Sequence, residues 1–343
     1  MTHAVEMNAT ADVVVPCYRY GRYLRQCVQS ILDQAQVRVR VFIIDDASPD
    51  ESADIGTEIA RGNENVTFLR HERNRGHIRT YNEGIEWASA TYFLLLSADD
   101  YLLPGALAYA TRMMEVSPDI SLVFGNALVE FDDGATETVY PLRDRGEKAG
   151  GRVFEGLDFV RLSGASNLVP TPTAVVRTQT QKRVGGYRPE LPHSGDMEMW
   201  LRFAAHGSIG FVDRLQAVYR RHAGNMSNLY DVANSLPDLR QRKAAIDTFL
   251  QSDGRNIAGG STLRRELYDD LGRIAIGRAS AAFNTGVTGA LQQLTEFAVD
   301  TSPKAKLSLP WMRLMAKRMI GLRAWNALQS VQQGMHPRSS RRL

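Results

Sequence analysis

The sequence predicts an α/β fold: an open, mostly parallel Rossmann-type sheet with helices on both faces, plus a helical C-terminal extension. Three observations predict this fold. Short apolar runs alternate with amphipathic segments over residues 12–125, which is the order of a parallel sheet with right-handed crossovers. Tyr92–Leu96 is continuously apolar, as in a strand covered on both faces. From Pro237 onward the periodicity is helical.

The first two strands are each followed by a helix. Asp12–Pro16 is a β-branched run that ends at proline, and the apolar residues of 24–32 fall on one helical face. The second strand, Val39–Ile44, runs into two aspartates. Cap-forming residues come next and predict a helix from about Glu51 to Ala60.

The rest of the alternation is predicted in the same way. Val66–Leu69 is a strand and Thr80–Ala88 a helix, and both precede the central strand Tyr92–Leu96. Pro104 is expected in the first turn of a helix that ends at Val116. Ile120–Gly125 is then the fifth strand of the sheet.

Past Asn126 the alternation weakens, and the expected elements are short. They are hairpin strands 127–131 and 138–140, strands 173–177, 209–212 and 217–220, and helices 179–184 and 196–206. The charged, Gly-rich stretch 143–152 is predicted to be a mobile loop. A boundary near 228–236 divides the chain into two predicted domains, residues 1–230 and 231–343.

The composition, 43% hydrophobic and 23% charged, is that of an ordinary globular protein. The net charge of +3 is unevenly spread, because no Asp or Glu follows Asp300. Cys17 and Cys27 fit free thiols in a reducing compartment. No signal peptide or membrane-spanning stretch is evident in the sequence. We therefore expect a cytoplasmic protein, with association to the inner face of the cytoplasmic membrane as an open alternative.

Acidic side chains follow strands or begin a helix at three places: Asp45 with Asp46, Asp99 with Asp100, and Asp196. The carboxyl ends of parallel strands meet at one edge of the sheet, where ligands bind. Adjacent carboxylates repel unless a cation compensates them, and oxygen ligands suit Mg²⁺ or Mn²⁺. The alternative is an Asp-rich turn that only caps the next helix.

Six segments of the chain resemble those of family 2 glycosyltransferases of the GT-A fold, the type that builds bacterial polysaccharides and cell-surface glycans. In chain order they are VVVPCYRYGRYLRQCVQSILDQ, VFIIDDASPDES, NRGHIRTYNEGIEWA, YFLLLSADDYLLPGAL, HSGDMEMWLRFAAHG and VYRRHAGNMS. The resemblance covers roughly the first two thirds of the chain. It implies inverting transfer of a sugar from a nucleotide-diphosphate donor, uridine-based by family frequency, to a glycan or lipid-linked acceptor, with a divalent metal.

The resemblance also assigns residues to the donor. Pro16 and Tyr18 resemble the loop beneath the nucleobase, and Asp46, with Asp45 beside it, resembles the carboxylate that accepts from base and ribose. Arg79 follows the third strand, where it would touch the nucleotide. The alternatives are a half-buried surface aromatic for Tyr18, helix capping for the aspartates, and a solvated helix face for Arg79.

Metal-binding and catalytic roles follow from the resemblance as well. Asp100 resembles the metal ligand, Asp99 would hold ribose or metal, and His222 of the closing YR-x-H stretch would bind metal or diphosphate. Many relatives have an additional Asp where this chain has Ser97. Asp196 resembles the general base, although the Glu that often precedes it is replaced here by glycine. The alternatives are an N-cap role for Asp196 and a structural histidine at 222.

Two questions stay open at the level of sequence. The basic tail, residues 303–343, interleaves large apolar residues with lysine and arginine. It fits a segment at a membrane interface or a helix packed on the body. No aromatic platform accompanies the charge, so nucleic acid is not expected. The rival functions are a nucleotidyltransferase, which the single glycine of CYRYGRY disfavours, and a non-catalytic sugar- or lipid-binding scaffold.

Overall fold

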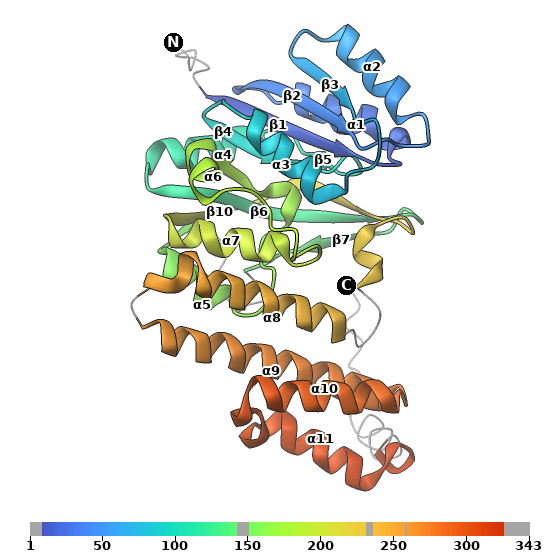
Figure 1. The fold of residues 1–343 in the computed structure, drawn as a ribbon, viewed down its shortest axis with the longest axis vertical. Helices are drawn as coiled ribbons and strands as arrows, with labels where there is room; N and C mark the ends of the chain where they lie inside the picture. The colour runs from blue at the N-terminus through green and yellow to red at the C-terminus, as the bar shows by residue number, and fades with distance from the viewer. Residues whose placement is uncertain (1–8, 143–150, 231–235, 258, 326–343) are drawn as a thin grey trace, which may run out of the picture.

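The computed structural model describes residues 9–142, 151–230, 236–257 and 259–325 (Figure 1). Within these residues one mixed sheet has the strand order β3-β2-β1-β4-β9-β6-β10-β5, with β7 paired to β6 and β8 to β10. The strands are β1 (Thr10–Cys17), β2 (Arg38–Asp45), β3 (Val66–Arg70), β4 (Tyr92–Leu95), β5 (Tyr101–Leu102), β6 (Ile120–Phe131), β7 (Thr136–Val139), β8 (Arg152–Phe154), β9 (Val175–Arg177) and β10 (Ser208–Arg221).

The helices divide into those of the α/β unit and those that follow it. The first group is α1 (Gly21–Leu32), α2 (Ser52–Gly62), α3 (His77–Trp87), α4 (Ala106–Val116), α5 (Gly156–Ser163), the 3₁₀ turn η2 (Thr171–Thr173), α6 (Thr178–Val184) and α7 (Gly195–Ala205). The second group is η3 (Met226–Leu229), α8 (Leu236–Gln251), η4 (Asp253–Asn256), α9 (Gly260–Asn284), α10 (Thr288–Thr301), η5 (Pro303–Leu307) and α11 (Leu309–Ile320).

Four parallel strands, β3-β2-β1-β4, form the predicted first half of the sheet. Alternate residues of β1 serve different cores: Val13 and Val15 pack with α1 and α4, whereas Val14 faces the core that contains α3 and α7. Both faces are therefore covered, which explains why the strands are apolar without a polar alternation. The predicted α/β fold with helices on both faces is confirmed.

The second half of the sheet departs from the prediction. β9 lies between β4 and β6 and runs antiparallel to both. β6 and β10 are single long strands where two shorter strands each were predicted, and their parallel pairing passes through bulges between Val212 and Ala217. The polar residues that suggested breaks are accommodated at these irregularities. The short strand β5, which pairs with β10, was not predicted.

Two helix and loop boundaries also differ from the prediction. Pro104 lies in a turn before α4, which begins at Ala106 after Gly105 in a left-handed conformation with φ 81°. Of the stretch predicted as a mobile loop, Arg152 starts β8, and residues 143–150 lie outside the described residues. The predicted domain boundary borders residues 231–235, which also lie outside them, so the division into domains stays a prediction.

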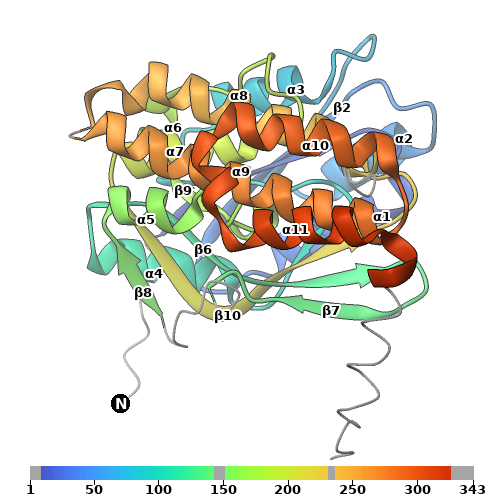
Figure 2. The same ribbon diagram turned by 90° about the horizontal axis from the view of Figure 1, so that it is seen from below.

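The C-terminal helices are stacked in successive layers beneath the sheet (Figures 1 and 2). α7 contacts α8, α8 contacts α9, and both α10 and α11 lie against α9. One continuous core of buried residues runs from the sheet through these helices, from Val14 of β1 to Leu314 of α11. None of the described helices has the length and apolarity required to cross a bilayer.

Candidate active site

The carboxyl ends of β2, β1 and β4 lie side by side because these strands pair in parallel. The backbone N–H of Asp46 donates to the carbonyl of Cys17 at 2.9 Å, and that of Ala98 donates to Pro16 at 3.2 Å. The two aspartate pairs that follow β2 and β4 therefore share one edge of the sheet, as the sequence predicted.

A cavity of about 670 Å³ opens at this edge. Asp99, Asp100 and Asp196 all line it, although Asp196 comes from the start of α7, about 100 residues further along the chain. The rest of the wall is rich in aromatic side chains and histidines, namely Tyr20, His77, Tyr81, Tyr187, His193, Tyr219 and Tyr230. Acidic groups from distant segments thus meet in one pocket.

Asp99 and Asp100 are buried together at the base of the cavity. The backbone N–H of Arg220 donates to Asp100 Oδ1 at 2.9 Å. The two oxygens of Asp99 differ in their hydrogen bonds. Oδ2 accepts from His222 and Asn225, each at 3.2 Å, whereas Oδ1 has no hydrogen-bond partner among the described residues. Burial, and then the neighbouring charge of Asp99, raise the pKa of Asp100 well above its usual range.

These two carboxylates fit a divalent cation. A buried carboxylate oxygen without a donor, beside a second carboxylate, calls for positive charge. No three His, Cys, Asp or Glu side chains of the described residues are placed to hold one metal ion together. A cation at Asp99 and Asp100 would therefore complete its ligands with phosphate oxygens and water, as Mg²⁺ commonly does.

His222 is engaged by protein groups on both ring nitrogens. Nδ1 accepts from the backbone N–H of Gly224 at 3.1 Å, and Nε2 lies 3.2 Å from Asp99 Oδ2. Because Nδ1 accepts, Nε2 carries the hydrogen and donates to Asp99. In this arrangement the imidazole orients the Asp99 carboxylate and has no lone pair directed at a metal.

Asp196 lies in the first turn of α7 and lines the same cavity. Its Oδ2 accepts from the hydroxyl of Thr171 at 2.9 Å, and Tyr187 also hydrogen-bonds to this carboxylate. Burial raises the pKa of Asp196, while the hydrogen bonds from Tyr187 and Thr171 oppose the rise. A carboxylate with a raised pKa, open to a pocket, is suited to accept a proton.

Aromatic rings that line the cavity pack against one another beside Asp196. Tyr81 of α3 packs edge-on against Tyr187 and His77, with ring centroids 5.3 Å and 5.4 Å apart. Burial, and then the charges of Asp196 and Asp99, raise the pKa of Tyr81 well above its ordinary value. Tyr81 is thus a neutral hydroxyl between the aspartate pair and Asp196.

Of the residues predicted for the donor, Asp99 lines the cavity, whereas Pro16, Tyr18, Asp45, Asp46 and Arg79 do not. Asp46 is engaged by its own surroundings: Oδ1 accepts from His71 and from the N–H of Arg75, both at 2.7 Å, and Oδ2 from the N–H of Gly76 at 2.9 Å. Asp45 is buried and accepts from the N–H of Ser48. Asp46 thereby shapes the loop that leads into α3.

The other predicted donor residues differ in exposure. Tyr18 is 39% exposed beside the same edge, and Pro16 is buried beneath it. Arg79 points from α3 toward solvent. The structure thus places Pro16, Tyr18, Asp45 and Asp46 at one sheet edge with Asp99 and leaves Arg79 apart from the cavity.

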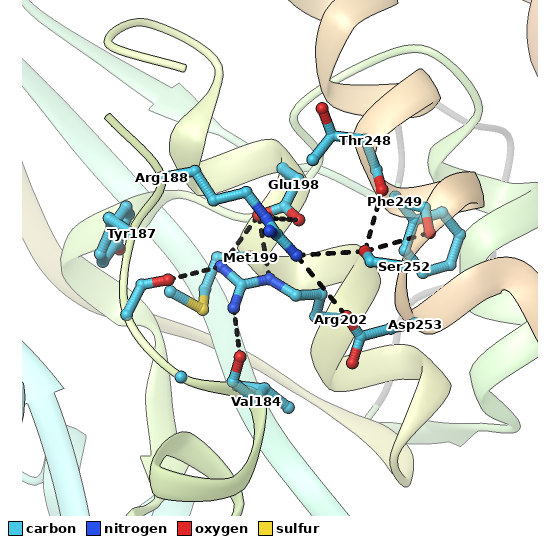
Figure 3. Close-up of polar contacts among 12 residues, drawn as sticks. Val184, Tyr187, Arg188, Glu198, Met199, Arg202, Thr248, Phe249, Ser252 and Asp253 are labelled. Carbon is cyan, nitrogen blue, oxygen red and sulfur yellow. Dashed lines mark hydrogen bonds and ion pairs between the residues drawn. The ribbon is translucent and has the colours of Figure 1, made fainter. Parts of the chain in front are cut away.

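A second buried charge cluster holds α7 in place (Figure 3). Glu198 is fully buried and accepts from Arg202 and Arg188, each at 2.9 Å. Arg202 also donates to the carbonyls of Val184 and Gly186, and Arg188 reaches Ser252 at 3.1 Å. The helix that carries Asp196 is therefore fixed both to the preceding loop and to the C-terminal helices, so Glu198 has a structural role in these contacts.

Sequence reasoning missed most of the aromatic wall. Tyr20, Tyr187 and Tyr230 lie in loops or at helix boundaries, where a single tyrosine carries no pattern. His77 and Tyr81 are four residues apart, so they share one helical face. This spacing, directly after a sheet edge with two aspartate pairs, was the one available signal.

The chain resembles known proteins over the segments that build this site. Residues 12–154 match the family model described as glycosyl transferase family 2. An uncharacterized Mycobacterium tuberculosis protein is 32% identical over 220 residues, covering 62% of this chain and 66% of the relative. The glycosyltransferase GlyG of Streptococcus pneumoniae is 29% identical over 35% of this chain and 40% of its own length. The chain thus spans at most about two thirds of these relatives.

Solved structures resemble the fold over nearly the whole chain. S. aureus TarS residues 1–349, in a crystal structure with UDP, superposes with a TM-score of 0.63 over 96% of this chain and 93% of that one, at 17% identity. A second crystal structure of the same protein, with UDP-GlcNAc, gives the same values. The likeness identifies a GT-A fold with C-terminal helices and, at this identity, concerns the fold alone.

Proposed function

This chain belongs to glycosyltransferase family 2, and we propose that it transfers a sugar from a UDP-sugar to an acceptor hydroxyl with inversion at the anomeric carbon. One observation carries the proposal: Asp99, Asp100 and Asp196 line the same cavity. The aspartate pair suits the charged end of a sugar nucleotide, and Asp196 suits the acceptor. The presence of UDP and UDP-GlcNAc in the TarS structures supports this class of donor.

The proposed reaction is one displacement. The acceptor oxygen attacks the anomeric carbon as its proton passes to the Asp196 carboxylate, and the bond to the diphosphate oxygen breaks with the electron pair on that oxygen. Thr171 and Tyr187 hold the carboxylate in place, and His222 and Asn225 fix Asp99. A divalent cation bound at Asp99 and Asp100, Mg²⁺ or Mn²⁺, would offset the charge of the departing diphosphate.

At the donor end, Pro16, Tyr18, Asp45 and Asp46 form the proposed nucleoside contact. These residues surround the ends of β1 and β2, next to the aspartate pair. The two oxygens of Asp46 already accept hydrogen bonds from residues 71–76, and these bonds fix the shape of that loop. Each oxygen has two lone pairs, so Asp46 contacts the nucleoside with a lone pair that the loop does not use. Arg79 is exposed, so its contact requires the nucleotide to extend over α3.

The test is a donor screen that measures release of nucleoside diphosphate, with and without Mg²⁺ or Mn²⁺. We expect release from at least one UDP-sugar that depends on added metal. Release of pyrophosphate instead would indicate a nucleotidyltransferase. Absence of both turnover and metal-linked nucleotide binding by calorimetry would indicate a scaffold.

We also propose contact with an anionic membrane surface through η5 and α11. One side of α11 packs on the body, where Leu314 is buried and Lys317 donates to Ser280 at 2.7 Å. Large apolar residues are exposed on η5 and on the other side of α11, namely Leu307 (82%) of η5 and Leu309 (68%), Met312 (51%), Met319 (87%) and Ile320 (44%) of α11. Exposed cations lie among them, namely Lys304, Lys306, Arg313 and Arg318. Apolar residues ringed by cations fit an anionic lipid surface.

Vesicle sedimentation tests this surface. We expect the protein to sediment with phosphatidylglycerol-containing vesicles and to stay in the supernatant with pure phosphatidylcholine. The double variant Met319→Ser/Ile320→Ser should lose the binding. Equal binding of the variant and the unaltered protein would rule out this face. The acceptor would then be proposed as a glycan without a lipid anchor.

A further inference from the structure

The proposed displacement predicts where the acceptor lies, and this inference rests on the proposed function. In an inverting reaction the attacking and leaving oxygens occupy opposite sides of the anomeric carbon. The diphosphate belongs at Asp99 and Asp100, so the acceptor hydroxyl meets Asp196, and the rest of the acceptor lies beyond it. The cavity wall on that side includes Pro192, His193 and Tyr230.

His193 and Tyr230 form a parallel aromatic stack in this wall. Their ring centroids are 3.9 Å apart, and the ring planes differ by 10°. Tyr230 directly follows η3 and His193 lies in the loop before α7, so two separate segments build one surface. Leu168 and Met226 add apolar surface to the lining of the same cavity, and Asn167 adds a side-chain amide.

The C-terminal helices hold the His193 ring in this orientation. Nε2 of His193 lies 2.9 Å from Asp238 Oδ1 of α8, and the backbone N–H of His193 donates to Gln241 Oε1 at 3.2 Å. Asp238 is itself 4% exposed and accepts from Arg242 of α8 and Arg278 of α9. A histidine with such support is kept in one rotamer, which is what a binding surface requires.

We propose that the His193–Tyr230 stack is the acceptor subsite and that it binds the C–H face of a sugar ring. Aromatic surfaces pack well against aliphatic C–H groups, and neighbouring polar groups bind the hydroxyls. The acceptor class is therefore a neutral glycoside presented with one hydroxyl toward Asp196. Asp238 acts as a positioning residue, because it contacts His193 and does not line the cavity.

The experiment is ligand-observed saturation-transfer NMR on the full chain with UDP and Mg²⁺. The probes are the methyl glycosides of glucose, mannose, galactose and N-acetylglucosamine, and only aromatic protein protons are irradiated. We expect transfer to the ring protons of at least one glycoside. His193→Ala and Tyr230→Leu should each weaken its binding about tenfold, the loss of one aromatic contact.

A matched control comes from a second His–Asp pair, which joins the end of α7 to the C-terminal helices. His206 lies 2.7 Å from Asp253 of η4, and neither residue lines the cavity. His206→Ala should therefore leave glycoside binding unchanged while removing a comparable contact. Circular dichroism melting of all variants identifies any that fail to fold, and the other variant then decides.

The outcomes separate this inference from the proposed function. UDP binding, measured by calorimetry on the same samples, reports on the donor end alone. If UDP binds but no glycoside does, or if His193→Ala and Tyr230→Leu bind glycoside as tightly as the unaltered protein, the subsite is wrong and the donor assignment stands. Failure to bind UDP with Mg²⁺ counts against the proposed function itself.

Discussion

The protein has one cluster of buried charge around Glu198 of α7 and another at Asp99 and Asp100 after β4, and the two differ in how completely their hydrogen bonds are made. Around Glu198, both carboxylate oxygens accept from arginines, and Arg202 has further backbone acceptors (Figure 3). Around Asp99, one oxygen has no donor among the described residues, and a second carboxylate is its neighbour. The carboxylates of both clusters are buried, yet only the second cluster has a carboxylate oxygen without a donor.

The difference separates a structural role from a chemical one. A buried ion pair whose hydrogen bonds are all made holds its partners in one geometry. A buried carboxylate pair in which one oxygen lacks a donor and the two charges repel is destabilising by itself and becomes favourable when a cation or ligand binds. In these two clusters, the completeness of the hydrogen bonds distinguishes the carboxylate with a structural role from the pair that we propose for the reaction.

The largest effect is expected from the incomplete cluster. Asp100→Asn should lower the rate of sugar transfer by at least about 10³-fold. The variant loses one of the two carboxylates that we propose to bind the cation, and this cation would offset the negative charge of the departing diphosphate. The melting temperature should stay the same or rise, since a buried like-charge repulsion is removed. Steady-state kinetics and calorimetric melting check both statements. Full activity of the Asp100→Asn variant would contradict the chemical role that distinguishes this aspartate pair from the Glu198 cluster.

Asp196→Asn is expected to have the next largest effect. Transfer should fall about 10²- to 10⁴-fold because the amide cannot take the acceptor proton. UDP binding should be unchanged, since the aspartate pair and the ends of β1 and β2 are untouched. Calorimetry with UDP and Mg²⁺ supplies this second measurement. Loss of UDP affinity in this variant would mean that Asp196 belongs to the donor site.

A change in the cluster around Glu198, whose carboxylate oxygens both have donors, should lower the stability of the folded protein. Glu198→Gln keeps the shape but leaves Arg202 without its counter-charge, which should cost about 3–5 kcal/mol of unfolding free energy. The matched control is Glu58→Gln, because Glu58 pairs with Arg25 on the surface, where the side chains are 68% and 54% exposed. The control should show no measurable change in urea unfolding. Similar losses in both variants would contradict the structural role of the buried cluster.

The smallest effect concerns the pH dependence of transfer. Burial raises the pKa of Asp196 above the ordinary aspartate pKa of about 3.9. The transfer rate should therefore begin to fall at a pH above this value, and it should fall about tenfold for each further pH unit of acidification. Thr171→Val removes a hydrogen bond that lowers this pKa, so the fall should move to higher pH. Tyr187, His77 and His193 also face the carboxylate and stay in place. A shift to lower pH would contradict the assignment.

The sequence predicted the parts of the molecule that depend on local pattern. The four parallel strands, their crossover helices and the aspartates after β2 and β4 all follow from short apolar runs and their polar ends. Asp99, Asp100 and Asp196 were identified by motif, and they do share a cavity. The hydrogen-bond partners of Asp46 could not be predicted from the sequence, because they depend on the conformation that residues 71–76 adopt in the folded protein.

The rest depends on contacts between distant segments. The antiparallel insertion of β9 joins residues 175–177 to strands 50 and more positions earlier, and no local periodicity encodes it. The same holds for His193, which is defined by partners on α8 rather than by its neighbours in sequence. Residues 231–235 and 326–343 lie outside the described part of the chain, so expectations for them stay predictions.

The hydrogen bond from Arg220 to Asp100 spans 120 positions of the chain. A ribosome releases the N-terminal strands first, so the two aspartates emerge well before the strand that covers them. Closing so long a loop is slow, because the chain entropy is lost before the contact is gained. The nascent protein therefore has the strands of its parallel sheet before it has a complete site, which also requires β10 and two residues that follow it, His222 and Asn225.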